Sequence, residues 1–179
     1  MSNKVLLLHG WSGSDFPHWQ AWLASELAKE YGEVSFLKFE DYDFPIKDIW
    51  KNQLIKQINS FNPDIVICHS VANILWFHLC NEVKLQQIKK LFLVAPPSLS
   101  CDIKELRSFY PCNLPNNLFA KDALLISSTN DPYISQEEVK TMAKQLNIPT
   151  KILQDAGHIN ADSGYGEWEW ILKEVQNVK

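Results

Sequence analysis

The chain has 179 residues, of which 46% are hydrophobic and 21% charged, and its formal net charge at pH 7 is −4. This length and composition are typical of a soluble globular protein, and we expect residues 1–179 to form a single domain. The negative charge argues against nucleic acid or an anionic membrane as a partner. No apolar run approaches the length of a membrane span, and no signal-peptide core follows Met1.

The cysteine and histidine spacings indicate neither a disulfide framework nor a metal site. The sequence contains no Cys-x-x-Cys pair, no zinc-finger spacing and no His-x-x-x-His pair. We therefore expect reduced thiols, a cytoplasmic location, and no metal or other cofactor. The four cysteines are Cys68, Cys80, Cys101 and Cys112.

Short aliphatic runs alternate with helix-like segments in the first part of the chain. Val5–Leu8 predicts a strand that is buried on both faces, and a Gly-rich loop follows it. Apolar residues at helical spacing, of which Tyr31 is the last, predict a helix over residues 17–31 that Gly32 closes. The next predicted elements are a strand over 34–39, a helix over 46–61, a strand ending at Ser70 and a helix over 72–79.

The second part of the chain continues this alternation after one long interruption. The pattern predicts strands over 88–95, 123–128 and Thr150–Leu153, and a closing helix over 164–178. A helix over 135–146 begins with a capping box formed by Ser135 and Glu138. Residues 96–122 contain Pro96, Pro97, Pro111 and Pro115 and only a short helical stretch near 102–109, and a loop of this length is often functional, for example as a lid.

The alternation of strands and helices indicates the fold class. Most of the predicted strands are unbroken aliphatic runs, as in parallel sheets that are covered on both sides. We therefore expect an α/β fold, compact, with a largely parallel sheet of about six strands and helices on both faces.

Residues 64–72 have the layout of a nucleophile elbow, in which a buried strand turns sharply into a helix with a serine at the corner. The turn requires small residues two positions before and after the serine, where glycine is usual. Here those positions hold Cys68 and Ala72. The pattern predicts Ser70 as an exposed nucleophile, with the N–H of Val71 facing a developing oxyanion. The alternative is a serine that only caps the following helix.

Reactive or Gly-rich residues follow four of the predicted strands, at His9-Gly10-Trp11, Ser70, Asp131 and His158. Because the carboxyl ends of parallel strands meet at one edge of the sheet, we expect these residues to converge. His158 would take the Ser70 proton as general base, and Asp131 would hold the imidazole. The order Ser, Asp, His along the chain is that of the α/β-hydrolases.

Each of these roles has an alternative that the sequence leaves open. Asp131 stands before Pro132 and is also suited to starting a turn, and His158 is also suited to a structural loop role. Asp155 is a rival acid, although it lies only three residues before His158 on the same strand end. We expect His69 and His78 to be structural, and the thiol of Cys68, at the end of a buried strand, to be inert.

The remaining site residues are expected around the loop after the first strand. The N–H groups of Trp11 and Val71 would form the oxyanion hole. The substrate pocket would include His9, Gly10, Trp11 and Trp168, together with part of the segment 96–122. His9 also suits a role in bracing its loop.

Five segments together carry a family resemblance. They are His9-Gly10-Trp11, Cys-His-Ser-Val-Ala at 68–72, Ser-Thr-Asn-Asp-Pro-Tyr at 128–133, Gly-His-Ile-Asn at 157–160 and Ser-Gly-Tyr-Gly-Glu-Trp at 163–168. They resemble the small serine hydrolases related to YdeN and to retinoblastoma-binding protein 9, over nearly the whole chain. The resemblance implies a compact α/β-hydrolase fold with Ser70, Asp131 and His158 as the triad. The departures are Cys68 and Ala72 in place of glycine, and Glu169 where relatives often have proline.

The leading functional hypothesis is an esterase-type hydrolase for a small carboxylic ester or related acyl compound. Because the segment 96–122 is too short for a large lid, we expect short acyl chains to be preferred. Two other functions stay open: a protein-interaction module on a hydrolase scaffold with weak or no turnover, and acyl transfer to an acceptor other than water. The expected partner is a small acyl substrate, and the sequence does not indicate a protein partner.

Overall fold

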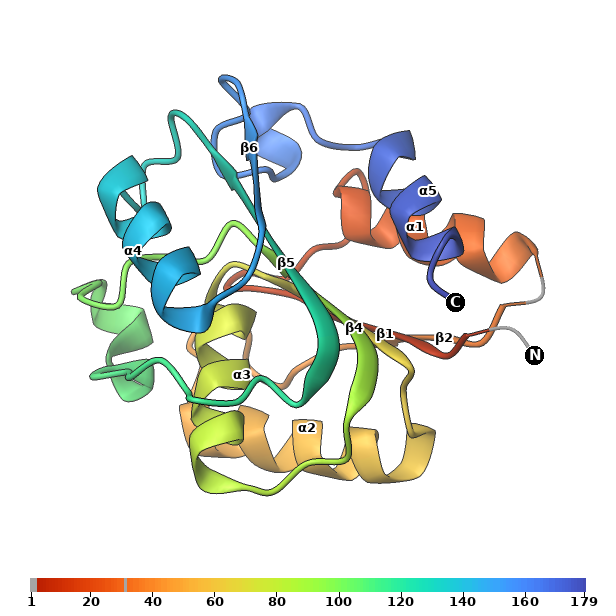
Figure 1. Cartoon of the computed structure of the whole chain (residues 1–179), viewed down its shortest axis with the longest axis horizontal. Helices are drawn as coiled ribbons and strands as arrows, with labels where there is room; N and C mark the ends of the chain where they lie inside the picture. The colour runs from red at the N-terminus through yellow and green to blue at the C-terminus, as the bar shows by residue number, and fades with distance from the viewer. Residues whose placement is uncertain (1–2, 31) are drawn as a thin grey trace.

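Six parallel strands form one sheet at the centre of the computed structural model, which describes residues 3–30 and 32–179 (Figure 1). The strands are β1 (Val5–Leu8), β2 (Val34–Leu37), β3 (Ile65–His69), β4 (Ile88–Val94), β5 (Ala120–Ser128) and β6 (Thr150–Leu153). Their order across the sheet is β2-β1-β3-β4-β5-β6, and every neighbouring pair is parallel. The predicted parallel α/β architecture is confirmed.

Helices cover both faces of the sheet, as expected. On one face, a core cluster packs residues of α2 (Lys47–Phe61), α3 (Val71–Glu82) and α4 (Gln136–Leu146) against the strands. On the other face, a second cluster packs α1 (Trp19–Lys29) and α5 (Glu169–Gln176). Successive residues of a buried strand point to opposite faces, so in β3 Val66 joins the first cluster and Ile67 the second.

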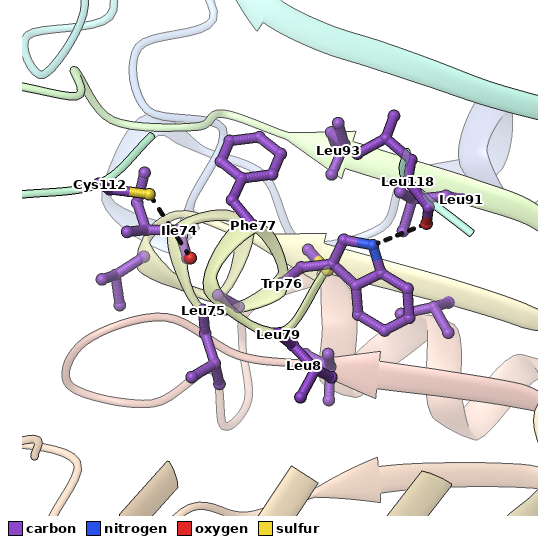
Figure 2. Close-up of a cluster of buried hydrophobic side chains, with 14 of the residues drawn as sticks. Leu8, Ile74, Leu75, Trp76, Phe77, Leu79, Leu91, Leu93, Cys112 and Leu118 are labelled. Carbon is purple, nitrogen blue, oxygen red and sulfur yellow. Dashed lines mark hydrogen bonds between the residues drawn. The ribbon is translucent and has the colours of Figure 1, made fainter. Parts of the chain in front are cut away.

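The first cluster is built around α3, which is almost wholly buried (Figure 2). Leu75 and Phe77 are completely inaccessible to solvent. The indole of Trp76 donates to the carbonyl of Leu118 at 3.2 Å, which ties the segment before β5 to the helix. This packing holds the start of α3, and therefore the corner at Ser70, in a fixed position.

The topology places a crevice beside that corner. From β1 the chain proceeds outward to β2, and it then returns to place β3 on the other side of β1. At such a switch point the loops after the two central strands diverge, and ligands bind outside the carboxyl ends of the strands. The loop after β1 and the elbow after β3 meet at this point.

The predicted boundaries agree with most elements but not with the last helix. The capping box of Ser135 and Glu138 and the strand Thr150–Leu153 are confirmed. The prediction of a helix from residue 164 is wrong, because Gly164 has a φ of 82° and ends a short 3-10 turn, and α5 begins only at Glu169. Tyr31 lies outside the described residues. Within those residues, no helix combines the length and apolar character that crossing a membrane requires.

Candidate active site

Ser70 occupies a strained corner between β3 and α3. Its φ of 56° and ψ of −129° lie in a region that residues other than glycine seldom adopt, and such strain gathers at functional sites. Cys68 and Ala72 are both completely buried on either side of the turn. The sharp elbow therefore forms without the usual glycines, since both side chains are small enough to pack into the core.

Asn73 stabilises this corner, a role that sequence reasoning missed. Its side-chain amide donates to the carbonyl of Ser70 at 2.7 Å and to that of Val94 at 2.9 Å. The N–H of Ser70 also donates to Val94, at 3.0 Å. The end of β4 thus holds the elbow from the neighbouring strand. The only signal in the sequence is an amide side chain three residues after the serine, which is too common to be recognised.

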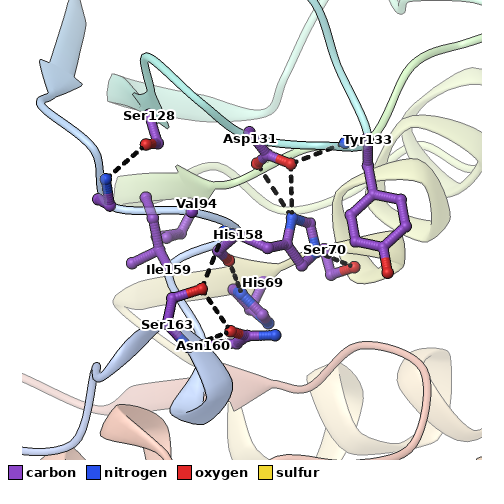
Figure 3. A network of polar contacts seen from close by, with 12 residues as sticks. His69, Ser70, Val94, Ser128, Asp131, Tyr133, His158, Ile159, Asn160 and Ser163 are labelled. Atoms are coloured by element: carbon purple, nitrogen blue, oxygen red, sulfur yellow. Dashed lines mark hydrogen bonds and ion pairs between the residues drawn. The ribbon is translucent and has the colours of Figure 1, made fainter.

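The structure brings Ser70, His158 and Asp131 together in one line of contacts (Figure 3). Oγ of Ser70 lies 2.9 Å from Nε2 of His158. Nδ1 of His158 lies 3.0 Å from each carboxylate oxygen of Asp131. Asp131 also accepts the N–H of Tyr133 at 3.0 Å, and it is only 8% exposed. With its proton on Nδ1, the imidazole presents the lone pair of Nε2 to the serine hydroxyl.

The rival acid, Asp155, does not contact His158. Its Oδ1 accepts from the hydroxyl of Thr129 at 3.4 Å, and its N–H donates to the same hydroxyl at 2.9 Å. Asp155 is exposed, whereas Asp131 is buried against the ring. Of the two acids, therefore, Asp131 and not Asp155 contacts the imidazole of His158.

Further hydrogen bonds hold the loop that carries His158. Nε2 of His69 lies 3.1 Å from the carbonyl of His158, so the residue before the serine donates to the backbone of the histidine. Oγ of Ser163 accepts the N–H of His158 at 3.2 Å, and the side chain of Asn130 accepts the N–H of Gly157 at 2.7 Å. The structural role expected for His69 is thus specific: it ties β3 to the loop after β6 (Figure 3).

Two amide groups beside Ser70 have no acceptor in the described part of the chain. The N–H groups of Trp11 and Val71 donate to no other described residue. Val71 is the first residue of α3, where an N–H has no partner within the helix. Gly10 brings the Trp11 loop close, since a Cβ placed on Gly10 would lie 2.6 Å from Cβ of Ser70.

A cavity of about 410 Å³ opens beside Ser70 and His158, and we call it the Ser70 cavity. This volume is within the range of sites for small molecules. Its lining residues come from the loop after β1, the elbow, the segment 96–122, and the loops after β5 and β6. They are Trp11, Ser12, Gly13, Ser14, Asp15, His18, His69, Ser70, Pro97, Cys101, Ile103, Leu106, Tyr133, His158, Asn160, Ala161 and Asp162.

Trp11 lines this cavity as expected, but the pocket roles predicted for His9 and Trp168 are wrong. The Trp168 ring is buried in the second core cluster, at 5.0 Å between ring centroids from Trp19. Nε2 of His9 accepts the N–H of Phe39 at 3.0 Å, and Nδ1 lies 2.7 Å from the carbonyl of Gly10. His9 therefore braces its loop. Gly10 is not among the residues that line the cavity and contributes instead through its close approach to Ser70.

One wall of the Ser70 cavity belongs to the segment 96–122. Its short 3-10 helix, η1 (Lys104–Phe109), anchors this wall, because Leu106 is 3% exposed and Phe109 is completely buried. Nε2 of His78 lies 2.7 Å from the carbonyl of Phe109, which joins η1 to α3. His78 is structural, as expected.

Burial sets the ionisation of several groups near the site. It lowers the pKa of His18 to about 4 and that of His69 well below the usual value, so both imidazoles are neutral at pH 7. Burial also raises the pKa of the Cys68 thiol, which makes it a poor nucleophile. All four cysteines are free, as expected. In the described ranges, His, Cys, Asp and Glu side chains form no group of three or more that could hold a metal ion.

A comparison with known protein families finds a match over nearly the whole chain. The model of the family described as serine hydrolase matches residues 5–177 of this chain. Among curated proteins, no sequence matches significantly.

Solved structures share the fold over nearly the whole chain. A YdeN-like hydrolase from Pectobacterium atrosepticum is 22% identical with a TM-score of 0.83, and 99% of this chain and 90% of that chain are covered. The ydeN gene product from B. subtilis is 18% identical with a TM-score of 0.84 and 97% of each chain covered. The Pyrococcus furiosus esterase Pf2001 is 18% identical with a TM-score of 0.64, covering 99% and 82%. The expected α/β-hydrolase fold and the likeness to YdeN are confirmed.

Proposed function

The chain belongs to the serine hydrolase family, and we propose that it is an esterase-type hydrolase that cleaves small carboxylic esters or related acyl compounds. The observation that carries this proposal is the line of contacts from Oγ of Ser70 through the ring of His158 to Asp131. These are the groups and distances that acyl transfer through a serine nucleophile requires.

In the proposed acylation step, Oγ of Ser70 attacks the carbonyl carbon of the ester while Nε2 of His158 takes the hydroxyl proton. Asp131 stabilises the imidazolium that forms. The N–H groups of Trp11 and Val71 donate to the oxyanion, and each such donor is worth about 3–4 kcal/mol in related enzymes. The intermediate then expels the alcohol, which takes the proton from His158, and an ester of Ser70 remains.

Deacylation repeats these roles with water as the nucleophile. Nε2 of His158 takes a proton from the water as its oxygen attacks the acyl carbon. Collapse of the second tetrahedral intermediate returns that proton to Oγ of Ser70, and the carboxylic acid leaves. With another alcohol or a thiol in place of water, the same steps would transfer the acyl group, so the geometry is equally suited to both acceptors.

Two observations support a small ester as the substrate. The Ser70 cavity, at about 410 Å³, has room for a short acyl chain, and its apolar lining includes Pro97, Ile103 and Leu106. A structural neighbour with the same fold is described as an esterase. The elbow backbone forms with Cys68 and Ala72, so these two residues do not by themselves favour the alternative of an interaction module without turnover.

The proposal is tested by labelling with a fluorophosphonate probe, which reacts with a serine that its surroundings have made nucleophilic. We expect wild-type protein to be labelled at Ser70, and Ser70→Ala and His158→Ala to lose labelling. Ser127→Ala is the control, because this buried serine does not line the Ser70 cavity. A folded wild type that takes no label and cleaves no short ester would contradict the proposal.

A further inference from the structure

We propose that Tyr133 binds the alcohol part of the ester and selects for an aromatic ring there, as in a benzyl or phenyl ester. This inference rests on the proposed esterase function, because it concerns the same cavity and the same acylation step. It goes further in naming the half of the substrate that the enzyme distinguishes and the side chain that contacts it.

The ring of Tyr133 is accessible and lies beside the imidazole of His158. It lines the Ser70 cavity and is 40% exposed. The centroids of the two rings are 4.5 Å apart, and their planes are inclined at 70°. Figure 3 shows the phenol ring next to His158 and Ser70. His69 also packs against His158, but it is only 4% exposed, so of these two neighbouring rings it is Tyr133 that a substrate can reach.

Hydrogen bonds on both sides of the residue fix the backbone of Tyr133. Its N–H donates to the carboxylate of Asp131 at 3.0 Å, and its carbonyl accepts the N–H of Ser98 at 2.8 Å. These bonds join the loop after β5 to the segment 96–122, and Pro97, the residue before Ser98, also lines the cavity. The ring is therefore attached to a backbone that is held against the triad before a substrate binds, which lowers the entropy cost of a contact with it.

The proposed chemistry determines where the alcohol part lies. In acylation, Nε2 of His158 gives its proton to the alcohol oxygen, so this oxygen comes within about 3 Å of Nε2. The oxyanion is held elsewhere, by the N–H groups of Trp11 and Val71. Because the alcohol oxygen approaches the imidazole, a ring one or two bonds beyond that oxygen comes within reach of Tyr133, which packs on the same imidazole.

The chemistry of the Tyr133 side chain favours an aromatic alcohol over a saturated one. Aromatic rings attract one another in offset or edge-to-face arrangements, and such a pair gains free energy beyond the burial of apolar area. Tyr133 already contacts the ring of His158 edge to face, and 40% of its surface stays accessible to a second ring. A saturated alcohol of the same size would gain only the burial of area.

The test uses two pairs of esters, and the members of each pair differ only in whether the ring is aromatic or saturated. Benzyl acetate and cyclohexylmethyl acetate carry the ring on the alcohol side, whereas methyl phenylacetate and methyl cyclohexylacetate carry it on the acyl side. Titration of the released acid gives kcat/KM for each ester, and the aromatic value is divided by the saturated value. Because intrinsic reactivity is the same for every protein variant, it cancels when these ratios are compared between variants.

We expect Tyr133→Leu to lower the aromatic-to-saturated ratio about two- to tenfold for the alcohol-side pair and to leave the acyl-side ratio unchanged. Tyr133→Phe retains the ring and should keep both wild-type ratios. Tyr165→Leu is the matched control. It makes the same change at a tyrosine that packs against Trp168, at 5.2 Å between ring centroids, and does not line the cavity, so both of its ratios should equal those of wild type.

Fluorophosphonate labelling at Ser70 verifies that each variant has an assembled site, and Tyr133→Ala replaces Tyr133→Leu if the latter does not fold. If Tyr133 only holds His158 in place, Tyr133→Leu slows all four esters by one factor and changes neither ratio, which contradicts the inference. A fall in the acyl-side ratio would place Tyr133 beside the acyl group and would also contradict it. In both cases the proposed function stands, because wild type cleaves the esters. If wild type takes no label and cleaves none of the four, both proposals are wrong.

Discussion

Gly10 and Ser70 lie so close together that a Cβ on Gly10 would come within 2.6 Å of Cβ of Ser70 and 3.2 Å of its Oγ. The two residues follow β1 and β3, which pair directly in the sheet. The contact therefore fixes the distance between the elbow and the loop that carries the N–H of Trp11, so it sets the width of the proposed oxyanion hole.

Gly10→Ala should lower kcat for a short ester about 100-fold, because the added methyl group displaces the serine hydroxyl from its contact with His158. Gly164→Ala is the control. Its φ of 82° makes alanine unfavourable by about 1–2 kcal/mol, but nothing lies within 4 Å of the added methyl group. Gly164→Ala should therefore lose stability in urea unfolding and keep its kcat. Equal activity of the two variants would show that the Gly10 contact does not matter.

Asp131→Asn should lower kcat about 10⁴-fold, because an amide in place of the carboxylate no longer holds the proton on Nδ1 of His158. Asp155→Asn makes the same chemical change at the acid that contacts Thr129 instead, and it should keep nearly full activity. Steady-state kinetics on one short ester decides between the two acids. The reverse pattern would assign the orienting role to Asp155.

Trp168→Phe should lower the free energy of unfolding by about 1–3 kcal/mol and leave KM unchanged, because the ring packs in the core against Trp19 and not in the Ser70 cavity. Trp11→Phe makes the same change at a residue that lines the cavity, and it should alter KM. Chemical unfolding and kinetics of both variants provide the measurement. If Trp168→Phe changed KM while Trp11→Phe kept the wild-type KM, Trp168 would belong to the substrate pocket after all.

The stability of the protein should fall as the pH drops from 7 to 5. Burial lowers the pKa values of His9, His18 and His69 in the folded state, that of His18 from 6.5 to about 4. Between these pKa values the unfolded chain binds protons that the folded chain does not, so the free energy of unfolding rises with pH in this window. Each fully buried histidine contributes about 1 kcal/mol per pH unit.

Urea unfolding at pH 5, 6 and 7 measures this slope. His18→Asn removes one of the three groups and should give a shallower slope than wild type. A free energy of unfolding that does not change over this range would mean that these imidazoles take up protons in the folded state.

The hydrolysis rate should depend on acyl chain length. A cavity of about 410 Å³ accepts a short chain, so kcat/KM for p-nitrophenyl acetate and butyrate should exceed that for the decanoate at least about tenfold. The measurement uses concentrations below micelle formation. Fastest hydrolysis of long chains or of triglycerides would contradict the size argument.

The order of elements and the three residues of the proposed triad could be predicted from the sequence, because their signals are local. An unbroken aliphatic run such as Val5–Leu8 is buried wherever it pairs, and parallel strands put their carboxyl ends at one edge of the sheet. This reasoning is enough to bring Ser70, Asp131 and His158 to the same edge. It also explains why the capping box at Ser135 was predictable, since a cap depends on four consecutive residues.

Only the tertiary structure decided which way the other side chains face. Trp168 and His18 both lie near loops, yet one is buried in the core and the other lines the Ser70 cavity. Which of Asp131 and Asp155 contacts the imidazole likewise depends on the position of His158, which lies 27 residues after Asp131 in the sequence. Such outcomes depend on packing between segments distant in the sequence, and a local pattern contains no information about that packing. The sequence by itself therefore determined which residues meet at the carboxyl edge of the sheet, while long-range packing determined the shape and lining of the cavity beside them.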